Sequence, residues 1–155
     1  MNAKNSDTRN KKQFSPQEIA ERCSAYLQEN DICAETLTIS IDSVGPGKAQ
    51  VSMKISDQFL NGHGFCQGGI ITLLADTAFA HASNSYNRVT VAQGLSVDFL
   101  LPVKAGEILT AIAVEKARSR LTGVYEIQVL DSMLKLVAIV SGKSFQKKSQ
   151  LLDLQ

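Results

Sequence analysis

Apolar and polar residues alternate along two early segments, residues 36–44 and 47–55. Because successive side chains of a strand point to opposite faces, this period of two predicts strands with one buried face. The residues Val-Gly-Pro-Gly at 44–47 join the two segments and are typical of a turn. The pattern therefore predicts an antiparallel hairpin.

The period of two returns in the second half of the chain. It predicts four further strands, at about Thr90–Leu100, Glu107–Ser119, Thr122–Asp131 and Met133–Phe145. The segments between them are short, which is typical of antiparallel neighbours.

The segment at 15–30 has the signals of a helix start. Ser15 can cap a helix, Pro16 suits the first helical position, and Glu18 completes a capping box with Ser15. The apolar residues of this segment fall on one side, so we expect the helix to pack by that side onto a larger element.

A second helix is predicted over 69–85, and it is apolar almost all round except for one carboxylate, Asp76. Such a helix must be covered by other elements. The sequence therefore predicts an α+β fold in which a curved antiparallel sheet of five to six strands wraps around one long buried helix.

The length of 155 residues is enough for one domain with a core. We expect a flexible polar tail at 1–13, a single domain at 14–146 and a C-terminal tail at 147–155.

The formal net charge of +1 creates no field that favours nucleic acid or a membrane. No secretory leader or membrane-spanning run is visible, and the three cysteines have no paired spacing, so we expect a cytoplasmic protein with reduced thiols.

Asp76 and the pair Gly68-Gly69 are the candidates for chemistry. A carboxylate partly removed from water has a raised pKa and suits a general base or nucleophile, although a capping or ion-pairing role is equally open. The first N–H groups of a helix are unpaired and can bind an oxyanion, and glycine lets a carbonyl approach them. A plain loop-to-helix turn would also use glycines.

The stretch LNGHGFCQGGIITLLADTAFAHASNS resembles the motif of hot-dog thioesterases of the phenylacetic acid degradation (PaaI-type) group. The segments QGLSVDFLLPVKAGE and LTGVYEIQVLD resemble the flanking strands of that group, so the likeness covers roughly residues 18 to 146. It implies the hot-dog fold and hydrolysis of acyl-CoA or aryl-CoA thioesters. It also implies that Asp76 acts as base or nucleophile and that the Gly68 N–H polarises the thioester carbonyl.

Three further catalytic positions follow from the resemblance. Asn61 matches the residue that orients the attacking water or the aspartate, and Ser96 matches a strand serine that helps to hold the water. Gln67 stands where the family usually has histidine. Because glutamine can form hydrogen bonds but does not titrate near neutrality, we expect Gln67 to orient its neighbours rather than transfer protons.

Other polar residues are candidates for binding substrate or CoA. Basic residues at strand ends bind CoA phosphates in related enzymes, but each is equally well a solvated surface charge. His63 with Cys66 could suggest a nucleophile pair or a metal site, yet a third group and metal-ligand spacing are missing, so no metal is expected. The binding candidates are Gly69, His63, Arg118, Arg120 and Lys143.

Helix geometry separates the two main candidates. Gly68 and Asp76 are eight residues apart, which is about 12 Å along one helix, too far to act on one carbonyl. Gly68 of one chain can instead face Asp76 of another across a two-fold axis, which requires a dimer. The resemblance implies the same interface site, and a tetramer of two such dimers.

The expected substrate is an aryl-acetyl-CoA, such as phenylacetyl- or hydroxyphenylacetyl-CoA, or a medium-chain acyl-CoA. No cofactor is expected, because coenzyme A is part of the substrate, and no nucleic acid or membrane partner is expected. The alternative is a non-catalytic acyl-CoA-binding hot-dog protein. Dehydratase chemistry is less favoured, because no His-Phe-Pro-Gly-type stretch is present.

Overall fold

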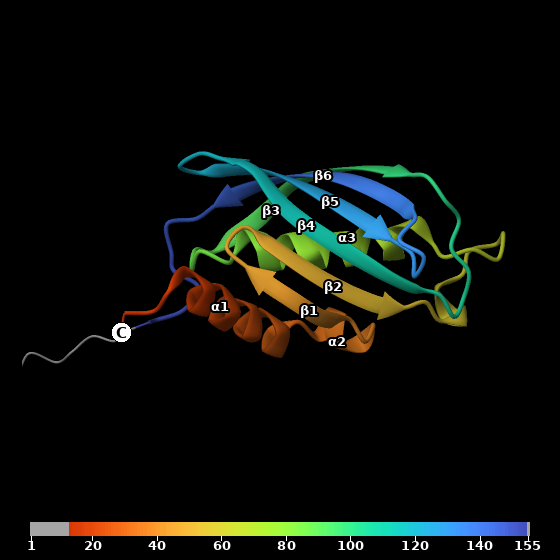
Figure 1. Ribbon diagram of the computed structural model, residues 1–155, viewed down its shortest axis with the longest axis horizontal. Coiled ribbons are helices and arrows are strands. Elements are labelled where there is room, and N and C mark those ends of the chain that lie inside the picture. The colour runs from red at the N-terminus through yellow and green to blue at the C-terminus, as the bar shows by residue number, and fades with distance from the viewer. Residues whose placement is uncertain (1–12, 155) are drawn as a thin grey trace, which may run out of the picture.

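The long apolar helix is present as α3 (Gly68–Ser83), and one antiparallel sheet of six strands wraps around it (Figure 1). The computed structural model describes residues 13–154, so the tail predicted at 1–13 lies outside the described residues apart from Gln13. The other elements, in chain order, are α1 (Pro16–Asn30), α2 (Ile32–Thr36), β1 (Ser40–Gly45), β2 (Lys48–Lys54), η1 (Asp57–Phe59), β3 (Thr90–Phe99), β4 (Ile108–Arg118), β5 (Thr122–Leu130) and β6 (Leu136–Gln146).

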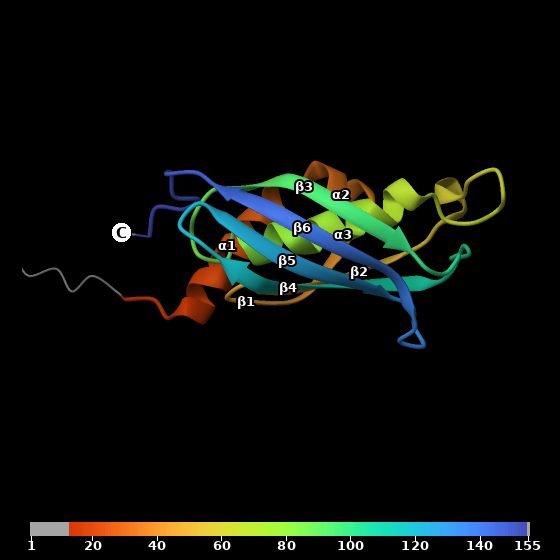
Figure 2. The same ribbon diagram turned by 90° about the horizontal axis from the view of Figure 1, so that it is seen from above.

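The strand order in the sheet is β1-β2-β4-β5-β6-β3. All neighbouring strands are antiparallel, as the short connections predicted. The chain leaves β2, passes through α3, and then crosses to the far edge of the sheet to form β3. Figure 2 shows β3 at this edge, beside β6. The predicted hot-dog arrangement, with its curved sheet around one helix, is confirmed.

The core lies between α3 and the concave face of the sheet. Leu74, Ala75 and Ala78 of α3 are fully buried, and the small alanines let the strands approach the helix closely. Phe79 packs edge-on against Tyr125 of β5, with ring centroids 5.1 Å apart. Burial of this apolar surface is the main favourable term in the folding of the domain.

The first helix begins as predicted. The Ser15 hydroxyl accepts a hydrogen bond from the Glu18 N–H, and the Glu18 carboxylate accepts one from the Ser15 N–H. α1 packs by one side against β1 and α3, where the Ser24 hydroxyl lies 2.7 Å from Nδ1 of the buried His81. This polar contact ties α1 to the central helix.

The predicted strand over 36–44 is wrong in its first part, because residues 32–36 form the short helix α2. The Asp31 carboxylate accepts a hydrogen bond from the Ala34 N–H and so caps this helix. Thr38 then takes a positive φ of 53°, and regular pairing with β2 begins only at Ser40. A local cap therefore overrides the alternation of apolar residues.

The last strand begins at Leu136 and not at Met133 as predicted. The Asp131 side chain accepts hydrogen bonds from the N–H groups of Met133 and Lys135, and Leu134 has a positive φ of 61°. These bonds build a tight turn that uses residues assigned to the strand.

The segment at 147–154, predicted to be a tail, is hydrogen-bonded to the loop after α3. The Asn87 side chain donates to the Leu152 carbonyl and accepts from the Leu152 N–H, and Lys147 and Ser149 pair with Val89. No helix in the described part of the chain is long and apolar enough to cross a membrane.

Candidate active site

The start of α3 presents two backbone N–H groups without a partner. Gln67 occupies the cap position, but its side chain makes no capping hydrogen bond. The first helical N–H groups that are paired belong to Ile70 and Ile71, which donate to the Gln67 carbonyl. Within residues 13–154, the N–H groups of Gly68 and Gly69 donate to no acceptor. They are therefore available to an oxyanion at the positive end of the helix dipole.

The two glycines differ in what surrounds them. A Cβ atom on Gly68 would lie 2.9 Å from Cζ of Phe99, so any side chain at this position would force the Phe99 ring to shift. A Cβ atom on Gly69 would meet nothing within 4 Å. Nothing in the described chain therefore requires glycine at position 69, although glycine is disfavoured in a helix. The open space beside Gly69 suits the approach of a group from outside the protomer.

Asp76 lies half-buried on α3 with neither a cap nor a cationic partner. No hydrogen bond or ion pair joins its carboxylate to another residue of the described chain. Burial raises the pKa of Asp76, and the negative charge of Asp31 raises it further. His81, the nearest basic residue in sequence, contacts Ser24 instead, and burial lowers the pKa of its imidazole. A capping or ion-pairing role for Asp76, which the sequence left open, therefore has no support in the described part of the chain.

Asn61 organises the loop that precedes α3. Its side-chain oxygen accepts hydrogen bonds from the N–H groups of His63, at 2.9 Å, and Phe65, at 3.3 Å. The side-chain amide nitrogen has no partner in the described chain and can still donate.

Asn61 and Gly68 line one common pocket of about 330 Å³. Its other walls are mostly apolar: Phe65, Cys66, Ile71, Phe99, Leu100, Leu101, Pro102 and Val103. We did not identify Phe99 and Leu101 as site residues from the sequence. The apolar run Phe-Leu-Leu-Pro-Val at the end of a strand pattern was the available signal, because such a run leaves side chains outside the alternation.

The side chains of His63 and Cys66 do not form a nucleophile pair. His63 is exposed on the loop, whereas Cys66 is 5% exposed and burial raises its pKa to about 11. The thiol therefore stays protonated near neutral pH and is a poor nucleophile. Among residues 13–154, no three His, Cys, Asp or Glu side chains come together as metal ligands.

Ser96 lies on β3 with its side chain on the outer face of the sheet. Its neighbours Leu95 and Val97 pack toward the core, and Ser96 pairs with Ser141 of β6. With Asp98 and Ser141 it borders a hollow on this outer face. Within one protomer, Ser96 therefore points away from α3 and is not brought together with Asp76.

The end of β4, the start of β5 and the end of β6 lie at the opposite end of the protomer from the start of α3 (Figure 1). Arg118 is the last residue of β4, Arg120 lies between β4 and β5, and Lys143 is near the end of β6. The Arg118 guanidinium stacks on the ring of Tyr86, 3.7 Å from its centroid, just beyond the C-terminal end of α3. Lys143 of β6 pairs with Gly94 of β3 and with Val124 of β5, near the same end of the protomer. The length of α3, about 24 Å, separates these cations from Gly68 within one protomer.

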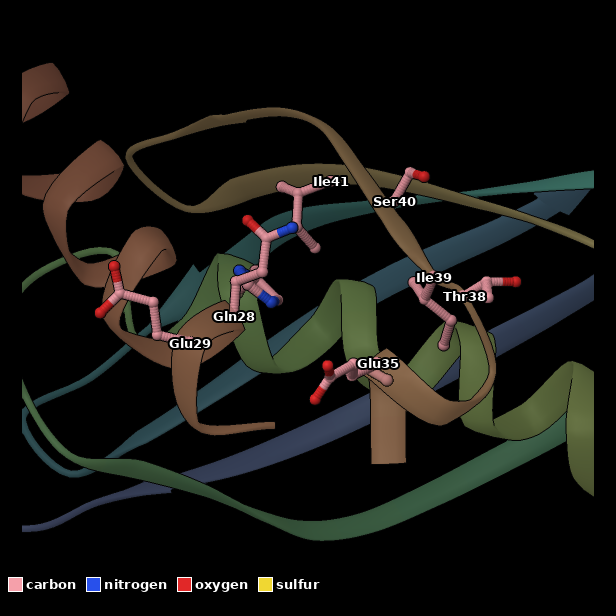
Figure 3. Close-up of a pocket in the computed structure, with 9 residues that line it drawn as sticks. Gln28, Glu29, Glu35, Thr38, Ile39, Ser40 and Ile41 are labelled. Carbon is pink, nitrogen blue, oxygen red and sulfur yellow. The ribbon is translucent and has the colours of Figure 1, made fainter. Parts of the chain in front are cut away.

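A second cavity, of about 450 Å³, lies between α1, α2 and β1 (Figure 3). Figure 3 shows Gln28 and Glu29 of α1, Glu35 of α2 and Ile41 of β1 around it. His81 also lines it, whereas Gly68 and Asp76 do not. The cavity is therefore separate from the pocket at the start of α3.

Replacing Asp76 by asparagine should stabilise the fold at neutral pH. Because the pKa of Asp76 is raised in the folded state, the ionised carboxylate destabilises the fold fully above the folded pKa. This penalty fades as the pH falls from the folded pKa to the unfolded pKa, and it is absent below the unfolded pKa. We expect Asp76→Asn to unfold at a higher urea concentration than the wild type at about pH 7.5, with the difference shrinking toward about pH 3.5. The exposed Asp98→Asn on β3 is the control and should change little; an unchanged midpoint for Asp76→Asn at neutral pH would contradict the expectation.

The sequence matches the thioesterase superfamily over residues 63–138. It is 46% identical to the acyl-coenzyme A thioesterase PaaI of Escherichia coli (strain K12) over 118 residues, which make up 76% of this chain and 84% of that protein.

Solved structures show the same fold. The E. coli PaaI protein from the phenylacetic acid degradation operon superposes with a TM-score of 0.86 at 41% identity, covering 88% of this chain and 99% of that chain. A Streptococcus mutans protein bound to acetyl CoA superposes with a TM-score of 0.70 at 25% identity, covering 72% of this chain and 90% of that chain. The chain therefore belongs to the thioesterase superfamily, within its PaaI-type group of hot-dog thioesterases.

Proposed function

We propose that this protein hydrolyses acyl-CoA thioesters to free acid and CoA. The acyl group is an aryl-acetyl group, such as phenylacetyl or hydroxyphenylacetyl, or a medium-chain acyl group. The observation that carries the proposal is the combination on one helix of unpaired N–H groups at Gly68 and Gly69 with an unpartnered carboxylate at Asp76. The name of the E. coli relative and the acetyl CoA bound to the S. mutans protein support the same substrate class.

The chemistry follows from these groups. The Gly68 N–H donates to the thioester oxygen and stabilises the negative charge that develops there. Asp76 takes a proton from water while the water oxygen bonds to the carbonyl carbon. Collapse of the tetrahedral intermediate breaks the carbon–sulfur bond, and the CoA thiolate leaves and takes up the proton. If Asp76 attacks the carbonyl carbon itself, the resulting anhydride is hydrolysed by water. Neither route uses a metal or an added cofactor.

The proposed site is shared between two protomers. The distance of about 12 Å along α3 prevents Gly68 and Asp76 of one chain from reaching one carbonyl. β3 offers the surface for a partner, because it is a ten-residue edge strand with no neighbour on its free side in the described chain. The exposed apolar side chain of Val91 lies along it.

Antiparallel pairing of two β3 edges would reverse one protomer relative to the other. The end of β3 in one protomer carries Phe99 and lies at Gly68. In the pair, this end would lie beside the start of β3 of the partner. That start is near the end of the partner that carries Arg118, Arg120 and Lys143. Arg118, Arg120 and Lys143 would thus bind CoA at the partner's site. Gly69 and His63, at the Gly68 end, would bind CoA at the site of their own protomer. A tetramer would join two such dimers.

The remaining polar residues have supporting roles in the proposal. Asn61 lies at the Gly68 end of the site and uses its free amide N–H groups to orient the water or the carboxylate of the partner's Asp76. Gln67, exposed beside the helix start, orients neighbouring groups without transferring a proton. Ser96, on the outer face of β3, reaches reacting groups only through the assembled interface.

A thiol-release assay over a panel of acyl-CoA substrates tests the proposal. We expect hydrolysis of phenylacetyl-CoA, and a loss in kcat of about 100-fold or more for Asp76→Asn, because the base is removed and the shape is kept. Asp98→Asn is the control. Binding of acyl-CoA without release of thiol would favour the non-catalytic alternative, and no binding at all would exclude both functions.

Mixing two inactive variants tests the shared site. Asp76→Ala removes the base. Gly68→Pro removes the N–H at the first helical position, and its ring also displaces the Phe99 side chain that fills the space beside Gly68, so this variant disables the same half of the site. Each variant alone should be nearly inactive, while their heterodimer, with one intact site of two, should regain about half the activity of a wild-type dimer. Mixing Asp76→Ala with Asp76→Asn should restore nothing. The shared site is wrong if exchanged chains of the first pair stay inactive.

The pH dependence of catalysis should depend on Asp31. Its negative charge contributes to the raised pKa of Asp76, so Asp31→Asn should lower that pKa and keep the base ionised to lower pH. Asparagine also caps helices well, so α2 should survive. We expect the acid limb of the kcat/KM profile to move to lower pH. Glu35→Gln removes one charge from the same short helix and should move the limb less; equal shifts would contradict a specific effect of Asp31.

A further inference from the structure

We propose that Phe99 is the specificity-determining residue of the acyl pocket. Its ring forms the wall that limits the size of the acyl group bound beside the Gly68 N–H. The inference rests on the proposed thioesterase function and names the part of the substrate that this pocket receives.

The Phe99 ring lies directly over Gly68. A Cβ atom built on Gly68 would be 2.9 Å from Cζ, 3.2 Å from Cε2 and 3.3 Å from Cε1 of Phe99. The edge of the ring therefore occupies the space in which a side chain at position 68 would stand. A carbonyl oxygen that accepts a hydrogen bond from the Gly68 N–H must place its acyl group close to this ring.

The ring is not part of the domain core. Phe99 is 52% exposed and stands at the last residue of β3, where the chain leaves the sheet edge. Leu100 and Leu101, the next residues, are also exposed. A large aromatic ring that is half-exposed beside unpaired N–H groups contributes less to stability than a core residue, and it is positioned to contact a ligand.

The pocket below the ring selects for apolar groups. Its volume of about 330 Å³ lies at the small end of ligand sites, and Phe65, Ile71 and Val103 form its apolar walls. Among residues 13–154, Asn61 is the one side chain with an amide or hydroxyl group that lines it. No charged residue of this described part lines the pocket, so a charged acyl group would lose its hydration without gaining a partner. An uncharged aromatic or short branched acyl group fits this lining, and an aromatic one can pack edge-on against Phe99.

The size of residue 99 should therefore decide which acyl groups are hydrolysed. Phe99→Ala would enlarge the pocket beside Gly68 and favour bulkier groups, whereas Phe99→Trp would reduce it and favour smaller ones. A difference of one methylene group in an apolar pocket changes kcat/KM by about 10- to 200-fold.

The test is to measure kcat/KM for acetyl-CoA, phenylacetyl-CoA and 1-naphthylacetyl-CoA with the wild type, Phe99→Ala, Phe99→Leu and Phe99→Trp. We expect Phe99→Ala to raise the ratio of naphthylacetyl-CoA to phenylacetyl-CoA by about 10-fold or more, and Phe99→Leu to raise it less. Phe99→Trp should raise the ratio of acetyl-CoA to phenylacetyl-CoA. Phe145→Ala, at a partly exposed phenylalanine of β6, is the matched control and should leave both ratios unchanged.

An equal fall in kcat/KM for all three substrates would overturn the inference, because Phe99 would then hold the helix start or contact the CoA moiety common to them. Phe99→Leu keeps most of the apolar volume, so a misfolded alanine variant would still leave the ratio measurable. Hydrolysis of a medium-chain acyl-CoA but of none of these three would overturn this inference alone. If the wild type hydrolysed neither these three nor a medium-chain acyl-CoA, the proposed function itself would fail, and this inference would fall with it.

Discussion

The packing of the sheet around α3 is the contact on which the rest of the structure depends. It removes the apolar surface of the helix from water, and the buried alanines of α3 allow the strands to approach its backbone. The sheet covers only part of the helix circumference. Asp76 is half-buried on the remaining part, and Gly69 in the first turn is exposed. The same packing that stabilises the domain therefore leaves a carboxylate and two N–H groups without partners.

These unpaired groups raise the free energy of the folded state. Groups that do so without a structural benefit indicate a functional site. A carboxylate that is half-buried and lacks a cation is disfavoured by desolvation, and the negative charge at Asp31 adds to the effect. Gly69 lowers helix propensity although the fold has room for a side chain. Features that break local rules without structural benefit are where function is expected.

The sequence predicted the fold class well because two strong periodicities coincide with two strong burial patterns. All six strands and both longer helices are present, and the position of the Gly68-Gly69 pair at the helix start is correct. α2 and the late start of β6 were missed, because the side chains of Asp31 and Asp131 hydrogen-bond to nearby backbone N–H groups. Such local bonds outweigh alternation over a few residues.

The site was harder to predict than the fold, because alternation fixes the face of a residue only once the register of the sheet is known. The resemblance assigns Ser96 to holding the water, and alternation with the core-facing Leu95 and Val97 turns its side chain to the outer face within one protomer. The contact of Phe99 with Gly68 joins residues distant in sequence and has no local signature. It depends on the crossing of the chain from α3 to the far edge of the sheet, which periodicity does not specify.

The contact between Phe99 and Gly68 also couples the two positions to each other. While the Phe99 ring lies over position 68, a methyl group there would have to displace the ring, whatever the site requires. In a chain with a small residue at 99, alanine at 68 would be sterically acceptable, and its N–H would still face outward. The presence of glycine at position 68 is therefore explained by the Phe99 ring as much as by the approach of the substrate. The two requirements can be separated only by changing both residues together.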